Sequence, residues 1–249
     1  MAKKLKDWFD RDCAARLGRA IAAHHGSFDV DAYADEIDRG IAGLELKERV
    51  RLMSDALRAR LPTDYKQAAP ILKASLGPPL DGETGMFTTG YWLMPVAQLV
   101  EDHGTNDPDI SLDLCQAITQ RNTAEYALRP YLEQHTAKTL GRVQTWTNHQ
   151  SSHVRRLASE GVRPRLPWAR QLEAFIADPS SALAVAERLR ADPSPYVRKS
   201  VANLINDVSK DHPETVLDLV TQWQIGAPKE TQWIIHHGTR TLRKKGLMD

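Results

Sequence analysis

Arginine side chains gather in one short segment of the sequence, residues 151–170, where they could bind phosphate. The segment has a single acidic residue, Glu160, and five arginines: Arg155, Arg156, Arg163, Arg165 and Arg170. The net charge of the whole chain is only +1, so this positive charge is a local feature. A basic surface on a nearly neutral protein favours docking onto phosphate groups over general polyanion binding.

Other residues with chemical potential form no recognisable site. The two cysteines, Cys13 and Cys115, stand alone in the sequence, which argues against a disulfide framework or a cysteine zinc site. The pairs His24–His25 and His236–His237 have no partner ligands at zinc spacing, and adjacent residues on a helix point about 100° apart. There is no P-loop, no GxGxxG motif after a strand and no GxSxG elbow. We therefore expect no metal ion and no cofactor.

The composition is that of an ordinary folded protein. Hydrophobic residues make up 41% of the 249 residues and charged residues 26%. No apolar run approaches the roughly 20 residues that a membrane helix needs. The basic N-terminal residues are not followed by the apolar run of a secretory signal. We expect a cytoplasmic protein with no membrane partner.

Helices must position the basic segment, because nearly every part of the sequence has helical periodicity. One apolar stripe with a 3.6-residue period consists of Val197, Val201, Leu204, Ile205 and Val208. Similar stripes begin at Val50 and Val216, and no strand-like alternation is present. The longest irregular stretch covers residues 77–90 and predicts a long connection. The predicted fold class is all-α.

The helices also repeat. Residues 153–158 resemble residues 196–201 at an offset of 43, and residues 233–236 are a weaker third copy at an offset of 37. A period near 40 with paired helices is typical of HEAT or armadillo repeats, which stack into a curved solenoid with a concave groove. We predict a single HEAT-like domain over residues 1–249, with N-terminal helices and a connection up to residue 90 and clearer repeats over residues 91–249. An irregular helical bundle is the alternative.

Superposing the repeats shows which residues share a helix face. Arg156 corresponds to Lys199 and Glu160 to Asn203, and within each helix the two positions are i and i+4. Asp207 lies one turn beyond Asn203. The pattern predicts a surface strip of cations and hydrogen-bond acceptors that could line a groove.

Two long blocks around these positions resemble a known family. Residues 153–168 and residues 196–213 are similar to the AlkC/AlkD superfamily of DNA alkylation-repair glycosylases, nearest to its AlkC branch. Weaker similarity includes residues 123–130 and 240–242. The resemblance implies a HEAT-like solenoid that holds double-stranded DNA in its groove and excises 3-methyladenine or, in the AlkC branch, 3-methylcytosine. It implies active-site acids at Glu125, Glu160 and Asp207 and an active-site tryptophan at Trp168.

The implied chemistry suits these residue types. Alkylation at N3 makes the base cationic and a good leaving group, so an enzyme must stabilise an oxocarbenium-like sugar and position water. Carboxylates near the sugar can do both. An indole beside a cationic base adds about 0.5–2 kcal/mol of attraction. No catalytic lysine is implied, so we expect a monofunctional, monomeric glycosylase that acts on DNA in the cytoplasm, associated with the nucleoid.

Each acid also has a structural interpretation. Glu160 is placed to form an ion pair with Arg156 or Arg163. Asp207 could pair with Lys210 at i+3, or join a polar network along its own helix.

Glu125 and the tryptophans have structural alternatives as well. Glu125 has Arg121 and Arg129 at i−4 and i+4, the spacing of surface salt bridges on a helix. Trp168 could be a core anchor. The remaining tryptophans considered lie on apolar faces and are expected in the core: Trp146, Trp223 and Trp233.

Phosphate contacts are expected from residues around two repeat-equivalent turns: Arg155, Arg156, Arg163, Arg165, Arg198, Lys199 and Asn203. Two non-catalytic interpretations compete with the glycosylase: a HEAT-repeat protein that binds damaged or branched DNA, and a protein-interaction scaffold. The catalytic interpretation requires the acids of neighbouring repeats to converge at a cleft within a positively charged surface.

Overall fold

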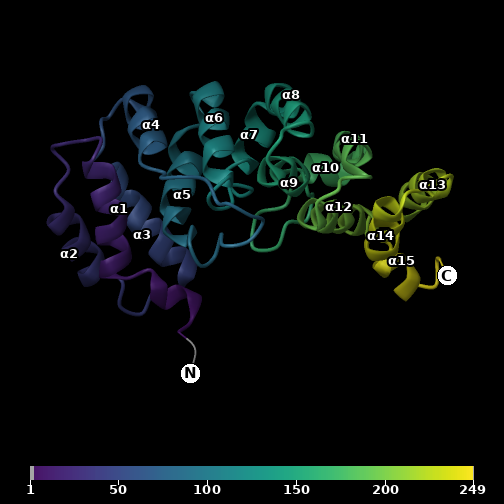
Figure 1. The fold of residues 1–249 in the computed structure, drawn as a ribbon, viewed down its shortest axis with the longest axis horizontal. Coiled ribbons are helices and arrows are strands. Elements are labelled where there is room, and N and C mark those ends of the chain that lie inside the picture. Colours follow the sequence, from purple (N-terminus) through teal and green to yellow (C-terminus); the bar gives the residue numbers. More distant parts are fainter. Residues whose placement is uncertain (1–2, 249) are drawn as a thin grey trace. The chain divides into compact units, whose positions relative to one another are not determined.

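The computed structural model describes residues 3–248, and the regular secondary structure of these residues is entirely helical (Figure 1). This confirms the all-α prediction. None of the described helices combines the length and the apolarity that crossing a bilayer requires. The chain divides into two compact units, Met1–Ala127 and Leu128–Asp249. The division that the sequence suggested near residue 90 falls inside the first unit.

From residue 3 onward the first unit contains six α-helices and two short 3-10 helices: η1 (Leu5–Trp8), α1 (Arg11–Ala22), α2 (Val30–Gly40), α3 (Leu46–Arg58), α4 (Tyr65–Ala74), η2 (Tyr91–Leu93), α5 (Met94–His103) and α6 (Pro108–Thr119). Aspartate side chains at Asp10, Asp29 and Asp64 cap α1, α2 and α4 by accepting backbone N–H bonds. Residues 75–90 contain no helix, so the predicted long connection is confirmed.

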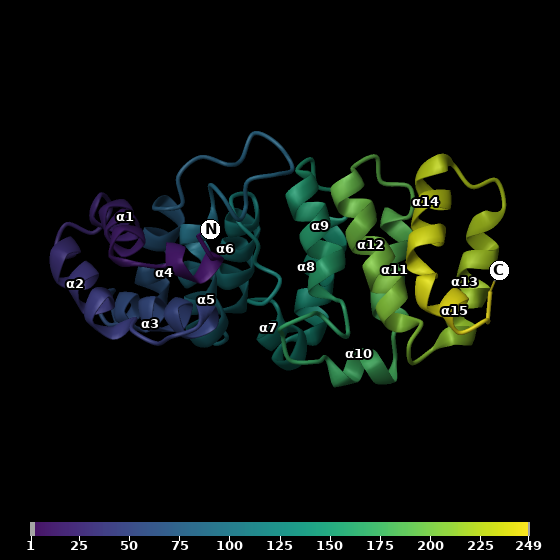
Figure 2. The same cartoon turned by 90° about the horizontal axis from the view of Figure 1, so that it is seen from below.

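The second unit consists of helix pairs stacked in order. Its helices are α7 (Arg129–Gln134), α8 (Thr136–Trp146), α9 (Ser152–Gly161), α10 (Glu173–Ala177), α11 (Ser180–Leu189), α12 (Pro195–Val208), α13 (Pro213–Gln224), α14 (Lys229–Gly238) and α15 (Arg240–Lys244). Helices α8, α11 and α13 pair with α9, α12 and α14. Helices α9, α12 and α14 lie side by side as an inner layer (Figure 2). The three helices that carry the sequence repeat are therefore equivalent in structure.

In each of the first two repeats, an arginine at the equivalent position donates hydrogen bonds to backbone carbonyls of the turn that starts the repeat. We call this arrangement the arginine clasp. Arg155 donates hydrogen bonds to the backbone carbonyls six and five residues before it, both at 2.9 Å. Arg198, 43 positions later, does the same at 3.3 and 2.9 Å. Each side chain thus satisfies carbonyls that the following helix cannot reach. The sequence repeat reflects this repeated turn as well as the apolar stripe.

Close packing fixes the end of α9. A Cβ atom built on Gly161 would lie 2.5 Å from Cδ1 of Leu128, so any larger residue requires the buried Leu128 side chain to move. The neighbouring residue in α9 is Glu160, which thus lies beside a closely packed turn.

The predicted core tryptophans divide into two groups. Trp146 and Trp223 are buried, as expected. The core prediction is wrong for Trp233, which is 38% exposed and stacks on His237 with 4.6 Å between the ring centroids. This residue lies at the edge of the inner layer, so its ring is covered on one side only.

Candidate active site

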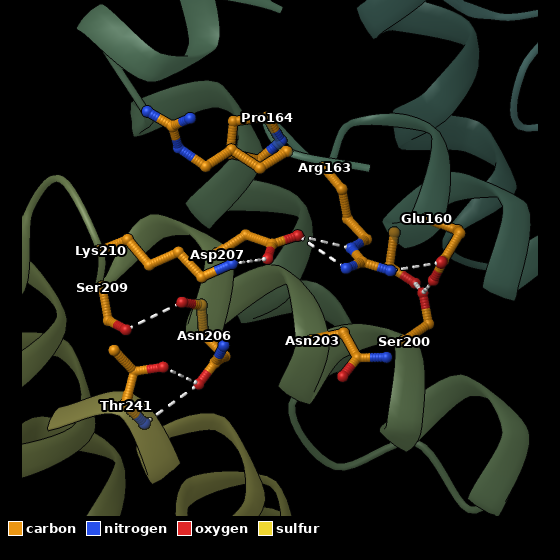
Figure 3. A network of polar contacts seen from close by, with 12 residues as sticks. Glu160, Arg163, Pro164, Ser200, Asn203, Asn206, Asp207, Ser209, Lys210 and Thr241 are labelled. Atoms are coloured by element: carbon orange, nitrogen blue, oxygen red, sulfur yellow. Dashed lines mark hydrogen bonds and ion pairs between the residues drawn. The ribbon is translucent and has the colours of Figure 1, made fainter. Parts of the chain in front are cut away.

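One guanidinium group joins the two predicted acids of the second unit. Arg163 donates from Nη1 to Oε1 of Glu160 at 2.6 Å, and from Nε to Oδ2 of Asp207 at 2.8 Å (Figure 3). Its Nη2 atom also lies 2.7 Å from Oδ2 of Asp207. Glu160 belongs to α9 and Asp207 to α12. Side chains from two neighbouring repeats therefore converge, which is one part of what the catalytic interpretation requires.

All four carboxylate oxygens of the pair have a partner. Oε2 of Glu160 accepts a hydrogen bond from Ser200 at 2.6 Å, and Oε1 lies 3.4 Å from Arg156. Oδ1 of Asp207 accepts from Lys210 at 2.9 Å. Both ion-pair alternatives predicted for Glu160, and the Lys210 pair predicted for Asp207, are present. The acids are held as a satisfied polar network.

Burial and charge have opposing effects on Glu160, which is only 6% exposed. Burial alone would raise the pKa of Glu160, but the charges of Arg156 and Arg163 and the hydrogen bonds from Ser200 and Arg163 outweigh it and hold the pKa below its ordinary value. The lowered pKa keeps Glu160 ionised at neutral pH. Two carboxylates face three cations, counting Lys210, so the network has no net negative charge.

The segment that carries Arg163, residues 162–172, is held by a second buried arginine. Arg129, 1% exposed, donates to the backbone carbonyls of Arg163 and Arg170 at 2.6 Å each. Longer bonds reach the carbonyls of Gly161 at 3.4 Å and Pro164 at 3.3 Å. These acceptors lie at both ends of the segment, so Arg129 fixes its closure. The position of Arg163 depends on this closure.

Trp168 lies at the tip of the same segment. It is 71% exposed, so the core-anchor interpretation is wrong. Its backbone adopts φ = 66°, the left-handed region that residues other than glycine rarely occupy. Such a conformation costs about 1–3 kcal/mol and persists only where the surroundings impose it. The closed segment thus presents an indole ring to solvent.

The remaining acid prediction concerns the first unit. Glu125 is buried, 6% exposed, and lies in a turn between α6 and α7 rather than in a helix. The helix expected from the i±4 arginine spacing is wrong here. Pro130 occupies the first turn of α7, a position that marks a helix start. That signal was present in the sequence.

The predicted surface strip is correct only in part. Lys199 is exposed and Asn203 half-buried, but Glu160 and Asp207 are buried. The strip prediction is therefore wrong for the two acids. It failed because the segment after α9 folds back over them, which the helical repeat alone does not reveal.

Most of the predicted phosphate-binding arginines are already neutralised. Arg155 holds Asp192 with bonds of 2.6 and 3.1 Å, and Arg165 holds Asp211 with bonds of 2.7 and 2.9 Å. Arg156 and Arg163 belong to the acid network described above. Arg198 binds backbone carbonyls, so Lys199 is the exposed cation of the predicted set.

Ser200 and Arg129 were not singled out by the sequence. Arg129 binds carbonyl oxygens, which every residue has, so no sequence signal marks its partners. Ser200 occupies a polar position within the apolar stripe of α12, and that position is the available signal.

Two surface hollows of the described residues lie at the C-terminal helices. One, of about 380 Å³, is lined by Gln224, Ala227, Gln232, Ile235, His236, Arg243 and Met248. The other, of about 310 Å³, is lined by Arg198, Lys229, Glu230 and Trp233. Neither of these hollows includes Glu160 or Asp207. Residues 3–248 also contain no group of three or more His, Cys, Asp and Glu side chains that could hold a metal ion.

Comparisons with known proteins give a consistent result. The chain is 37% identical to the uncharacterized protein YhaZ of Bacillus subtilis over 243 residues, 97% of this chain and 65% of the relative. It superposes with a TM-score of 0.87, at 35% identity, on the Pseudomonas fluorescens alkylpurine DNA glycosylase AlkC bound to DNA containing an abasic site analog. That match covers 99% of this chain and 66% of the other. The chain thus spans just under two thirds of the length of these relatives.

A family model described as DNA alkylation repair enzyme matches residues 117–242, just over half of the chain. The match includes the helices that carry Glu160, Asp207 and the segment with Trp168. The chain belongs to the DNA alkylation repair enzyme family.

Proposed function

We propose that this protein is a DNA glycosylase that hydrolyses the bond between deoxyribose and a cationic alkylated base, with 3-methyladenine and 3-methylcytosine as candidate substrates. The observation that carries the proposal is the likeness over 99% of the chain to AlkC, a structure described as an alkylpurine DNA glycosylase bound to DNA. The convergence of Glu160 and Asp207 from adjacent repeats supports it.

The proposed reaction needs only carboxylates and water. The N-glycosidic bond breaks and the cationic base leaves as a neutral base, while positive charge develops on the sugar. Glu160 and Asp207 stabilise that charge through their field. The water oxygen then bonds to C1′, and a carboxylate accepts the proton that the water releases. Glu125 is a further candidate for this role from the first unit.

Asp207 must exchange a partner before it acts, because both of its carboxylate oxygens are already bound, Oδ2 by Arg163 and Oδ1 by Lys210. Lys210 is the cation most open to exchange, since its side chain is 42% exposed whereas that of Arg163 is 7% exposed. A DNA phosphate that draws Lys210 away frees Oδ1 of Asp207 and leaves the network neutral. DNA binding would thus activate the site.

Trp168 is proposed to contact the lesion base. The exposed indole can stack against a cationic base, an attraction of about 0.5–2 kcal/mol. Its strained backbone fits a functional position.

The test is release of free base from methylated duplex DNA, followed by chromatography. Wild-type protein should release 3-methyladenine or 3-methylcytosine and leave an abasic site without cutting the strand. Glu160→Gln and Asp207→Asn should each slow release by about 10²–10⁴-fold, the usual contribution of a general base. Asp211→Asn is the matched control, because Asp211 forms a partly exposed pair with Arg165 outside the network. Release unaffected by both network variants would refute the mechanism.

A second function is favoured by one observation. The two acids are buried in ion pairs, and neither hollow described above includes them. This arrangement suits a protein that binds damaged or branched DNA without cutting it. Tight DNA binding with no base release from any methylated substrate would favour this alternative.

A further inference from the structure

The charge differs among three positions that the sequence repeat makes equivalent. Glu160 in α9 corresponds to Asn203 in α12, 43 positions later, and to Arg240 at the start of α15, a further 37 positions later. An acid, a neutral amide and a base thus follow one another. Asn203 and Arg240 touch, since Nη2 of Arg240 donates to Oδ1 of Asn203 at 3.0 Å. Glu160 in the first repeat could stabilise a cation, whereas Arg240 at the equivalent position of the third repeat could bind an anion.

Arg240 belongs to a basic group of side chains with Lys199 and His237. Its Nη1 atom donates to the backbone carbonyl of His237 at 2.8 Å. Burial lowers the pKa of His237, and Arg240 and the surrounding cations, Lys199 among them, lower it further. Lys199 and Asn203 are four positions apart on α12 and so share one helix face, and Arg240 contacts Asn203, which brings the two cations to the same surface. Within residues 3–248, Lys199, His237 and Arg240 form no ion pair with a carboxylate.

The group differs in this respect from the arginines that the sequence favoured as phosphate contacts. Arg155, Arg163 and Arg165 each hold an aspartate, and a phosphate would have to displace it. Positive charges without a counter-ion repel one another, and an anion between them removes that repulsion. Burial lowers the pKa of Arg240 against the opposing field of Asp207, whose oxygens are taken by Arg163 and Lys210.

The side chains around the group are held in place. The ring of Trp233 stacks on His237 at an interplanar angle of 11°, and the Arg198 guanidinium lies over the Trp233 ring, 5.9 Å from its centroid. Oδ1 of Asn206 accepts hydrogen bonds from the backbone and hydroxyl of Thr241 at 3.2 and 2.9 Å, which fixes the start of α15 (Figure 3). The surface is ordered before any ligand arrives, so little conformational freedom is lost on binding.

We propose that Lys199, His237 and Arg240 form a binding site for a phosphodiester of the duplex backbone, at the junction of α12, α14 and α15. This inference rests on the proposed function for its choice of DNA as the ligand. Arg240 supplies a fixed charge oriented by Asn203, Lys199 an exposed ammonium group, and His237 a ring donor. The contact is to phosphate, so it is independent of base sequence.

The test is the salt dependence of binding to an unmodified fluorescent duplex, measured by anisotropy between about 50 and 200 mM chloride. Each phosphate contact contributes about 0.9 to the slope of log K against log salt. Arg240→Ala and Lys199→Ala should each reduce the slope by about 0.9, and the double variant by about 1.8. Arg240→Lys should retain most of the slope. Arg188→Ala, an exposed arginine on α11, is the matched control and should leave it unchanged.

The outcomes separate this inference from the proposed function. Wild-type protein that releases methylated base while the variants keep the full slope would overturn the phosphate site alone. Reduced slopes in the variants, with no base release by wild-type protein, would support the site and refute the glycosylase. Inorganic phosphate at matched ionic strength should displace no more duplex than chloride does. Selective displacement by phosphate would show that the site prefers a free anion and would overturn the assignment to the duplex backbone.

Discussion

Replacing Arg163 with methionine should destabilise the second unit severely, because the substitution removes one charge from between two buried acids. The side chains of Arg163, Glu160 and Asp207 are only 7%, 7% and 3% exposed. Removing one partner of a buried pair leaves an uncompensated charge and costs about 3–5 kcal/mol. Methionine keeps most of the apolar volume, so the effect reports the charge and its hydrogen bonds.

The matched control is Arg165→Met, two residues away in the same segment. Arg165 holds Asp211 with two short bonds of 2.7 and 2.9 Å, but their side chains are 29% and 26% exposed. Partly exposed pairs of this kind contribute about 0–1 kcal/mol. Urea denaturation followed by circular dichroism should therefore give a much smaller loss of unfolding free energy for this variant than for Arg163→Met.

The loss should also depend on pH. The pKa of Glu160 is held below its ordinary value, so the ionised form stabilises the folded state above about pH 4.3, the unfolded value. This contribution disappears as pH falls through the folded pKa. In Arg163→Met the pKa of Glu160 rises because burial is less well opposed. The difference between wild-type and variant unfolding free energies should therefore be large at pH 7 and smaller near pH 3. A difference below 1 kcal/mol at pH 7, or one independent of pH, would refute the reasoning.

Three further predictions concern packing, loop closure and thiol chemistry. Gly161→Ala should lower the unfolding free energy by about 1–3 kcal/mol in urea denaturation, because the new methyl group would lie 2.5 Å from Leu128; an unchanged midpoint would contradict the close approach. Arg129→Met should make residues 162–172 the first site of limited proteolysis while the helices keep their circular dichroism signal, since four carbonyl contacts are lost; cleavage at the wild-type rate would contradict the closure role. Burial raises the pKa of the Cys13 thiol to about 12, so Cys13 should not react with Ellman's reagent at pH 8 until urea unfolds the protein, and rapid labelling of the native chain would show that the thiol is accessible.

The repeat could be predicted from the sequence because it is local. The apolar stripe of α12 and the offset of 43 residues identified α9 and α12 as neighbours in one layer, and the structure confirms this. The spacing also correctly predicted the pairs that Glu160 forms with Arg156 and Arg163, since three or four positions on a helix bring side chains together.

The burial of the site could not be predicted in the same way. Glu160 and Asp207 are covered because residues 162–172 fold back, and this conformation depends on Arg129, more than thirty positions upstream. The partners of Arg129 are backbone carbonyls, which leave no pattern in the sequence. The exposure of Trp168 follows from the same segment and from a left-handed backbone conformation that no sequence rule assigns to tryptophan.

The arginine clasp at each repeat has a consequence for how this fold can change. Arg155 and Arg198 use acceptors within their own turn, so a segment of 43 residues carries both donor and acceptors with it. Duplicating or deleting such a whole segment would leave every clasp complete, whereas an insertion between a turn and its arginine would separate the two. Growth of the inner layer by whole segments is therefore compatible with a stable chain. A newly added segment can diverge outside its turn, as the acid, amide and base at Glu160, Asn203 and Arg240 illustrate, while the turn itself stays intact.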